Sequence, residues 1–209
     1  MNPANNYLGS PIERVEDNAL LTGAGRYIDD LPLPVGTLYA AVVRSPVAHG
    51  KIIDVDISSA QTVKGVRAVL TISDVQEWSN PLVVAVKTPM KQWVLAHEYV
   101  RYVGEPIAIV IAESRALAED GAEKIVVNID PITAITDVDV ALQDDAVILH
   151  KEIGSNCVSD RHFSYGNPDL AFKEAAQVVE VDIRYPRNSC TPMETGGVVA
   201  QWRGADSSY

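Results

Sequence analysis

Hydrophobic and polar positions predict three strands in the first third of the chain. Residues 37–44 (TLYAAVVR) form a short apolar run rich in strand-forming residues, which Ser45-Pro46 ends. Residues 51–57 (KIIDVDI) alternate apolar and acidic positions, which favours a strand with one solvated face. Residues 66–72 (VRAVLTI) return to the apolar, β-branched composition of a strand.

A short helix is predicted over residues 60–64, between the second and third of these strands. Ser58 or Ser59 could cap its first turn, and Gly65 could close it. The order strand, helix, strand is that of a βαβ unit, which implies parallel strands and a right-handed crossover.

The clearest pattern in the chain is a second unit of this kind. Residues 107–112 (IAIVIA) are continuously apolar, as expected for a strand covered on both faces. Ser114 is the expected N-cap of a helix over residues 115–124, and residues 125–129 form the return strand. Gly121 weakens the helix by about 1 kcal/mol relative to alanine, so we expect close contact between helix and sheet there.

Three segments lack a regular pattern. Residues 1–20 are polar and irregular. Residues 73–92, which contain Pro81 and Pro89, are expected to form a loop. Residues 131–160 place acidic residues among small ones, which favours a linker or an extended crossing segment.

A third unit is predicted after this linker. Asn167-Pro168 is a good start for a helix over residues 169–176. Residues 177–185 alternate as a half-buried strand does, and residues 197–203 predict a further strand without a return strand. The chain is therefore expected to be α/β (α+β), with a first domain built on βαβ units and an incomplete second α/β domain. An exposed apolar surface is expected at Val198, Val199 and Trp202.

The composition is acidic, with 17 Lys and Arg against 28 Asp and Glu and a net charge of −11. This charge argues against a nucleic-acid partner, since phosphate binding needs a basic face. No run approaches the ~18 apolar residues of a membrane-spanning helix, and the first residues lack the features of a secretory signal. Cys157 and Cys190 are too few for a disulfide framework. We expect a cytoplasmic protein with no membrane partner.

Most residues with catalytic or ligating chemistry stand in patterns that indicate structural roles. Gly23-Ala24-Gly25 fits neither phosphate-loop motif and is interpreted as a turn. Adjacent carboxylates, as in Asp144-Asp145, point to opposite faces of an extended chain. Neither Cys157 nor Cys190 has a neighbouring histidine that would support a thiolate nucleophile. The histidines lack metal-ligand spacing and are interpreted as structural: they are His49, His97, His150 and His162.

Glu105 precedes Pro106 and a buried strand, and a role in the turn is favoured over a chemical one. An independent enzyme would need a pocket near His49, Glu105 or Glu194, but no convergent set of acid, base and nucleophile is evident. Residue chemistry alone assigns no catalytic or metal-ligating residue, and it leaves the cofactor-binding residues unknown.

Several segments carry a family resemblance. They are GAGRYIDDL (23–31), LYAAVVRSPVAHGKI (38–52), VRYVGEPIAIVIAESRALAEDGA (100–122), GNPDLAFKEAAQVVE (166–180) and PMETGG (192–197). Together they resemble the molybdenum-binding large subunits of the molybdenum hydroxylases, the family of xanthine dehydrogenase, aldehyde oxidase and carbon monoxide dehydrogenase. The resemblance implies a tail at 1–15, an α/β hammerhead domain at 16–130, a linker at 131–160 and the beginning of a molybdopterin-binding domain at 161–209.

The resemblance also implies an activity and partners. Complete enzymes of this family hydroxylate a carbon centre, often in an aldehyde or an N-heterocycle, with oxygen taken from water. Electrons pass from molybdenum held by molybdopterin through iron–sulfur clusters to FAD, which in bacteria often lie on separate subunits. The implied partners are the remainder of the molybdenum subunit and the iron–sulfur and FAD subunits, in a two-fold assembly of heterotrimers.

Two motifs of that family are absent from these 209 residues, the glycine-rich cofactor motif and the C-terminal catalytic glutamate. No residue here therefore inherits a catalytic or molybdopterin-binding role. We expect a part of a large subunit, as a split gene product, a separate subunit or a truncation, which acts only when docked to the rest. The alternative is an interaction or scaffold module that uses the hammerhead fold without chemistry.

Overall fold

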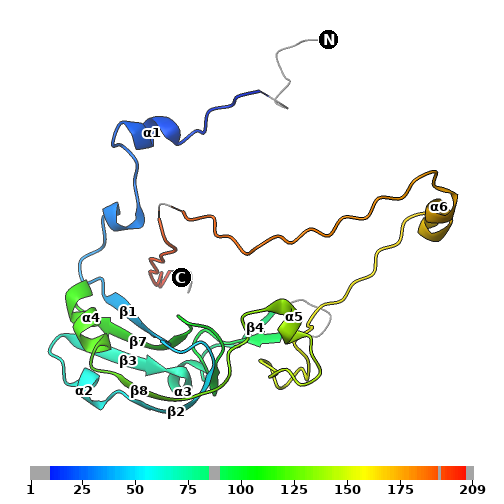
Figure 1. The fold of residues 1–209 in the computed structure, drawn as a ribbon. Helices are drawn as coiled ribbons and strands as arrows, with labels where there is room; N and C mark the ends of the chain where they lie inside the picture. The colour runs from blue at the N-terminus through cyan, green and yellow to red at the C-terminus, as the bar shows by residue number, and fades with distance from the viewer. Residues whose placement is uncertain (1–9, 85–89, 193, 206–209) are drawn as a thin grey trace. The chain divides into compact units, whose positions relative to one another are not determined.

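The computed structural model describes residues 10–84, 90–192 and 194–205 (Figure 1). The chain divides into two units: the main unit, residues 35–178, and the terminal unit, residues 1–34 together with 179–209. The described strands form two three-stranded sheets and a two-stranded hairpin. The mixed α and β structure predicted from the sequence is confirmed.

The first sheet has β7 (Pro106–Ala112) at its centre, between β1 (Tyr39–Arg44) and β3 (Val66–Thr71). The composition of β7 explains this place. Its residues are apolar throughout, so both of its faces can be covered without burying an unpaired polar side chain. Val110, near the middle of β7, is fully buried.

Helix α4 (Arg115–Ala122) packs against this sheet. The Ser114 Oγ accepts a hydrogen bond from Leu117 N at 3.3 Å, so the predicted N-cap is confirmed. Gly121 faces the sheet, and a Cβ added there would lie only 2.8 Å from Val110 Cγ1. The close contact predicted at Gly121 is therefore confirmed.

The second sheet has β2 (Gly50–Asp56) at its centre, between β6 (Tyr99–Val100) and β8 (Val126–Pro131). In β2, Asp54 and Asp56 are exposed while Ile52 and Val55 are half-buried, and Ile53, where the register shifts against β8, is 61% exposed. A hydrophobic cluster forms on the inner face. Its members are Val47, Ile52, Val55, Ala96, Val100, Ile107, Val127 and Ile129.

The parallel pairing predicted for the βαβ units is wrong. Every pairing between described strands is antiparallel. Helix α2 (Ser58–Gln61) leads from β2 in the second sheet to β3 in the first, and α4 leads from β7 in the first sheet to β8 in the second. The order strand, helix, strand requires parallel pairing only when both strands share a sheet, and here each helix connects two sheets.

The predicted serine cap of α2 is also wrong. The N-cap position is Ile57, whose side chain cannot accept a hydrogen bond. The Asp56 Oδ1 accepts a hydrogen bond from Ser58 N at 2.9 Å instead. Gly65 has a φ of +89°, in the left-handed region that favours glycine, and it follows the helix as predicted.

The segment 73–92, predicted to be a loop, contains regular structure. Helix α3 (Ile72–Val75) covers its beginning. Strands β4 (Leu82–Val84) and β5 (Met90–Gln92) pair as an antiparallel hairpin. Pro89 lies outside the described residues. Each strand has only three residues, and two of the three in β5 are polar, so neither produces a strand pattern in the sequence.

The segment that follows β8 is irregular except for one helical turn, α5 (Val138–Ala141). The Asn156 side chain connects three parts of this segment by hydrogen bonds. Its Oδ1 accepts a hydrogen bond from Leu149 N at 3.0 Å, and its Nδ2 donates to Ala141 O at 3.1 Å and to Val147 O at 2.9 Å. This amide uses both donors and its acceptor within one segment.

Helix α6 (Pro168–Glu174) begins as predicted. The Asn167 Oδ1 accepts a hydrogen bond from Leu170 N at 3.1 Å, and proline occupies the first helical position. Among the described helices the longest, α4, has eight residues, so none of them could cross a bilayer.

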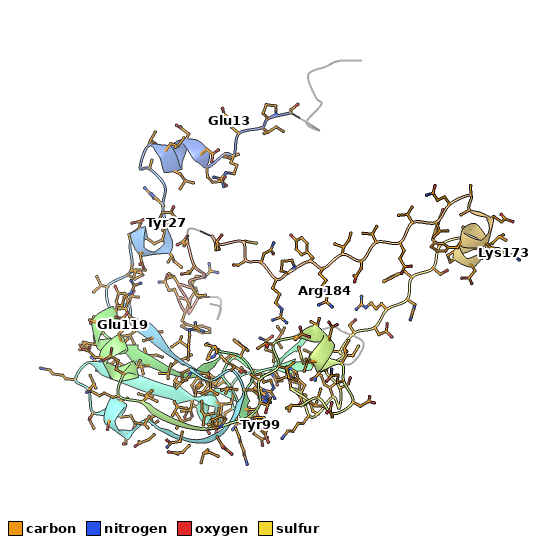
Figure 2. The ribbon with its side chains drawn as sticks, viewed as in Figure 1. Glu13, Tyr27, Tyr99, Glu119, Lys173 and Arg184 are labelled. Atoms are coloured by element: carbon orange, nitrogen blue, oxygen red, sulfur yellow. The ribbon has the colours of Figure 1, made fainter. Side chains whose placement is uncertain are left out.

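The strands predicted at 177–185 and 197–203 are not formed. Every described residue from 159 onward is exposed, and side chains such as that of Arg184 project from an extended trace (Figure 2). A strand without a neighbouring strand or a packed face is not stable in water. The exposed apolar surface predicted in the second segment is confirmed, since Val198 is 88% exposed.

The terminal unit contains α1 (Asp17–Leu21) and the 3-10 helix η2 (Ile28–Asp30). The turn predicted at Gly23-Ala24-Gly25 follows α1, and Gly23 adopts a φ of +72°. The Glu194 carboxylate accepts a hydrogen bond from the main-chain N–H of Ile28. This bond joins the two parts of the chain that make up the unit.

Candidate functional site

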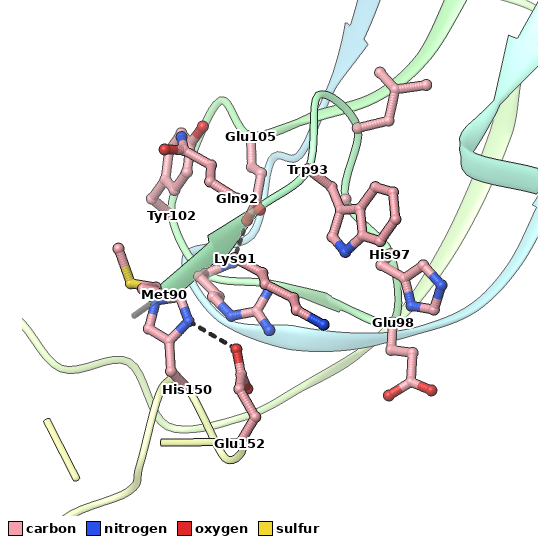
Figure 3. Close-up of a pocket in the computed structure, with 13 residues that line it drawn as sticks. Met90, Lys91, Gln92, Trp93, His97, Glu98, Tyr102, Glu105, His150 and Glu152 are labelled. Carbon is pink, nitrogen blue, oxygen red and sulfur yellow. Dashed lines mark hydrogen bonds and ion pairs between the residues drawn. The ribbon is translucent and has the colours of Figure 1, made fainter. Parts of the chain in front are cut away.

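A hollow of about 380 Å³ lies in the main unit, and Figure 3 shows it in close-up. It gathers carboxylates, imidazoles and cationic side chains, which makes it the candidate site of this unit. Three stretches of sequence contribute to it. The lining residues are Met90, Lys91, Gln92, Trp93, Leu95, Ala96, His97, Glu98, Arg101, Tyr102, Glu105, His150 and Glu152.

Glu105 lies in the turn before β7. Its Oε2 accepts a hydrogen bond from Arg101 N, and its own N–H donates to Tyr102 O at 3.2 Å. Burial raises the pKa of this carboxyl above its usual value, while the N–H groups of Arg101 and Tyr102 and the Arg101 charge act in the opposite direction. The carboxylate closes its own turn, which favours the structural role over the chemical one.

Arg101 connects this turn to a distant part of the chain. Its Nε donates to Leu149 O at 3.1 Å, and its Nη1 donates to Tyr99 O at 3.3 Å. Both acceptors are main-chain oxygens. The guanidinium therefore holds the segment around Leu149 against the end of β6.

One further contact joins the same segment to Tyr99, and another lies within the segment. Lys151 Nζ donates to Tyr99 Oη at 3.1 Å and lies 4.5 Å from the centroid of the Tyr99 ring. His150 Nδ1 lies 3.4 Å from Glu152 Oε1, as the dashed line in Figure 3 marks. Partial burial acts to raise the pKa of Glu152, but its own N–H, His150 and the Arg101 charge hold it below its usual value.

An aromatic pair forms another wall of the hollow. The rings of Trp93 and His97 stack with centroids 5.8 Å apart and planes inclined by 24° (Figure 3). Offset stacking of this kind stabilises the loop that carries both residues. It joins two side chains that are four residues apart in an irregular segment.

The polar side chains of this hollow bind main-chain atoms and are not arranged as a set of catalytic groups. Glu105 and Arg101 use their hydrogen bonds on main-chain atoms. No Ser, Thr or Cys stands among the lining residues that the structure describes. Within the described residues, no group of three or more His, Cys, Asp or Glu side chains could hold a metal ion. We assign no reaction to this hollow.

The other residues with catalytic or ligating chemistry lie outside the hollow. His49, immediately before β2, is buried, and its Nδ1 lies 3.1 Å from Thr133 O, so it packs in the core. His162 is exposed, 3.8 Å from Asp160. Cys157 and Cys190 are both exposed and free. Glu194 belongs to the terminal unit.

Sequence reasoning missed the gathering of His97, His150 and Glu105 around one hollow. His97 and Glu105 are eight positions apart, and His150 lies 45 positions further on. No motif spacing marks such a set. The one usable signal in the sequence is the polar turn before β7, where Glu105 stands beside a buried strand.

Comparison with known proteins identifies the family. Residues 22–132, more than half of the chain, match the family described as "aldehyde oxidase and xanthine dehydrogenase, a/b hammerhead domain". The chain belongs to this family. Residues 149–209 match the molybdopterin cofactor-binding domain. The region that matches the hammerhead family contains both three-stranded sheets, α4 and the turn that carries Glu105.

Curated relatives extend far beyond the region of similarity. The nicotine 6-hydroxylase large subunit of Paenarthrobacter nicotinovorans is 34% identical over 201 residues, which cover 94% of this chain and 24% of that protein. The carbon monoxide dehydrogenase large chain of Hydrogenophaga pseudoflava is 33% identical over 204 residues, which cover 90% and 25%. The chain spans about a quarter of the length of these relatives.

Solved structures give the same result. Quinoline 2-oxidoreductase from Pseudomonas putida 86 superposes with a TM-score of 0.68 and 37% identity, covering 80% of this chain and 22% of that one. The Cu,Mo-CO dehydrogenase superposes with a TM-score of 0.59 and 34% identity, covering 72% and 19%. The resemblance to molybdenum hydroxylase large subunits is therefore confirmed.

The described residues from 159 onward do not form a site for a molybdopterin cofactor. A cofactor site needs a concave surface with converging polar groups. Residues 159–192 and 194–205 are exposed throughout, and a Cβ added at Gly196 would meet nothing within 4 Å. At Gly197 the side chain of Ile28 already occupies the nearest space, 2.8 Å from an added Cβ. We derive no reaction step through the cofactor.

Proposed function

We propose that this chain supplies the hammerhead domain and the beginning of the molybdopterin-binding domain of a molybdenum hydroxylase large subunit. The observation that carries the proposal is the order of the two family matches, 22–132 and then 149–209, in one chain. Within it we propose a tail at 1–15, the hammerhead domain at 16–130, a linker at 131–160 and the second domain from 161.

The activity proposed for the complete enzyme is an oxidoreductase reaction that hydroxylates a small molecule. Aldehydes and N-heterocycles are the proposed substrate class, supported by the names of relatives that act on nicotine and quinoline. Molybdenum held by molybdopterin would supply the redox chemistry in the complete subunit. Iron–sulfur clusters and FAD would lie on partner subunits, in a heteromeric complex located in the cytoplasm.

The role proposed for these 209 residues themselves is structural, in folding and assembly. The hollow supports this proposal, because Arg101 and Glu105 use their polar atoms to hold main chain. The exposure of every described residue from 159 onward also supports it, since such a segment needs a partner surface in order to fold. We propose no nucleic-acid and no membrane partner.

The test is the native mass and metal content of the protein purified gently from its source. The proposal predicts a large complex that contains molybdenum, iron and at least one further chain. A metal-free species with the mass of this chain alone, stably folded over residues 159–205, would overturn it. That result would support the alternative, an interaction module that uses the hammerhead fold without chemistry.

A further inference from the structure

Two motifs that lie far apart in the sequence meet in the terminal unit. The first, GAGRYIDDL (23–31), contains η2, and the second, PMETGG (192–197), contains Glu194. The Glu194 Oε1 accepts a hydrogen bond from the main-chain N–H of Ile28 across a separation of 166 residues. Neither motif contributes to the hollow, so the hollow does not explain why these residues are present.

A second contact lies three residues further along the second motif. At Gly197, an added Cβ would lie 2.8 Å from Ile28 Cδ1 and 3.1 Å from Ile28 Cγ2, so the isoleucine side chain fills the space that a larger residue would need. At Gly196, an added Cβ would meet nothing within 4 Å. Ile28 thus contacts both ends of residues 194–197, with its main chain at one end and its side chain at the other.

Burial singles out Ile28 as the residue that makes this contact. Every other residue between 26 and 36 is exposed, whereas Ile28 is half-buried. Removing its aliphatic side chain from water stabilises the contact. The side chain is also β-branched and has few rotamers, so fixing it in one position costs little conformational entropy.

The turn that carries Ile28 begins at Tyr27 (Figure 2) and is held by its own hydrogen bonds. The Asp30 Oδ2 accepts from Tyr27 N at 2.9 Å, and Asp30 N donates to Tyr27 O at 3.0 Å. Leu31 N donates to Ile28 O at 3.3 Å. Because Asp30 already satisfies the N–H of Tyr27, the N–H of Ile28 is left for an acceptor from elsewhere in the chain.

Residues 194–197 have no such support of their own. Within the described part of the chain, no hydrogen bond between main-chain groups holds them. We propose that residues 27–31 form a clip that docks residues 194–197, with Glu194 as the residue that positions them. Ile28 lies in the hammerhead family match and Glu194 in the match to the molybdopterin cofactor-binding domain, so the clip joins the two matches.

The inference goes beyond the proposed function, because it concerns contacts within these 209 residues and not the activity of a complete enzyme. The competing partner for Ile28 is Glu194 of a second copy of this chain. The net charge of −11 disfavours that pairing, because two acidic chains repel each other on approach. Within one chain the two segments are tethered, which raises their effective concentration.

Amide hydrogen exchange, measured by nuclear magnetic resonance on the full chain, tests the clip. Glu194→Ala removes the acceptor, and we expect the Ile28 amide to exchange at least about tenfold faster, as the loss of a hydrogen bond to a charged group predicts. Glu194→Gln keeps an oxygen acceptor and should stay within about threefold of wild type. The amides of β7, which belong to the main unit, should exchange at the same rate in both variants.

The two glycines supply a matched control for the side-chain contact. Gly197→Ala places a Cβ against Ile28, whereas Gly196→Ala places one in open space. We expect Gly197→Ala to shift the methyl signals of Ile28 and to speed the exchange of its amide at least about threefold, because the isoleucine must move. Gly196→Ala should leave both measurements at their wild-type values.

Each contrary result overturns the inference. If the Ile28 amide exchanges equally fast in wild type and in Glu194→Ala, the carboxylate does not hold it. If the two glycine variants behave alike, Ile28 does not pack on Gly197. If the β7 amides accelerate together with that of Ile28, the substitutions unfold the chain and the clip is not a separate contact.

Dilution of the wild-type chain separates the two possible partners of Ile28. Protection of its amide that is independent of concentration supports the clip. Protection that is lost on dilution assigns the acceptor to a second copy and overturns the inference. The proposed function has its own test, the native mass and metal content, so the two proposals can fail separately.

Discussion

Arg101 and Leu149 are joined by a hydrogen bond of 3.1 Å from the guanidinium Nε to the main-chain oxygen. The arginine lies in the part of the chain that matches the hammerhead family, and the leucine is the first residue of the match to the molybdopterin-binding domain. The first residue of the second match is therefore held to the hammerhead domain by a specific contact.

Arg101→Lys should loosen this docking. Lysine keeps the charge but lacks the planar fork that reaches Leu149 O and Tyr99 O together. We expect a loss of about 1.5–3 kcal/mol in the free energy of unfolding, the range for hydrogen bonds that involve a charged group, and faster hydrogen exchange in residues 147–156. Urea denaturation and exchange mass spectrometry measure the two effects.

Arg67→Lys is the control for that change. Arg67 pairs with Glu113 on the surface, where an ion pair contributes little to stability. It should leave both measurements near wild type. If the two variants behave alike, the Arg101 contact does not hold the segment.

Asn156→Ala should destabilise the same segment. The side-chain amide accepts from Leu149 N and donates to Ala141 O and Val147 O. Removing it leaves partly buried main-chain groups without partners, at a cost of about 1–3 kcal/mol in the free energy of unfolding. Asn188→Ala, at an exposed position, should cost less than about 0.5 kcal/mol. Thermal and urea unfolding compare them, and equal losses would contradict the prediction.

Gly121→Ala should destabilise the chain although alanine is the better helix former. The added Cβ would lie 2.8 Å from Val110 Cγ1 and 3.0 Å from Val66 Cγ2. Overpacking of this kind costs about 1–3 kcal/mol, which exceeds the helix-propensity gain of about 1 kcal/mol. Asp120→Ala, on the exposed side of α4, gains propensity without a clash and should be neutral or stabilising. Higher stability in Gly121→Ala would show that α4 can move away from the sheet.

Glu105→Gln should change how stability depends on pH. Burial raises the pKa of this carboxyl, so the folded chain binds its proton more tightly than the unfolded chain does. Wild-type stability therefore falls as pH rises from the unfolded value near 4.5 through the raised folded value. Glutamine keeps an acceptor for Arg101 N and carries no charge.

We therefore expect Glu105→Gln to be more stable than wild type at pH 7 by less than about 1 kcal/mol, since solvent screens a half-exposed carboxylate. The advantage should disappear below about pH 4. Unfolding by urea at several pH values measures it, with Glu98→Gln as an exposed control in the same hollow. A variant less stable than wild type at pH 7 would mean that the ionised carboxylate's hydrogen bond outweighs its burial.

Local sequence patterns predicted those helices and strands that are determined by residues close together in the chain. The continuous apolar run at β7, the Ser114 cap, the close approach at Gly121 and the Asn167-Pro168 start of α6 were all found in this way. Each depends on side-chain chemistry or backbone freedom at one position.

Signals of the same kind failed where the outcome depends on a distant partner. The prolines near residues 81–92 suggested a loop, yet β4 and β5 pair there. Residues 177–185 have the alternation of a strand, yet the structure shows no strand there. A strand forms only when a second strand lies beside it and accepts its main-chain hydrogen bonds.

The sequence by itself determined the positions of β1, β2, β3, β7, β8 and α4, the acidic character of the chain and the family to which it belongs, because these are properties of residues taken in order. Tertiary structure alone decided that the strands pair antiparallel across two sheets and that Arg101 meets Leu149. Strand direction and such contacts follow from which segments lie side by side, and hydrophobic alternation specifies a face to bury without specifying the neighbour that covers it.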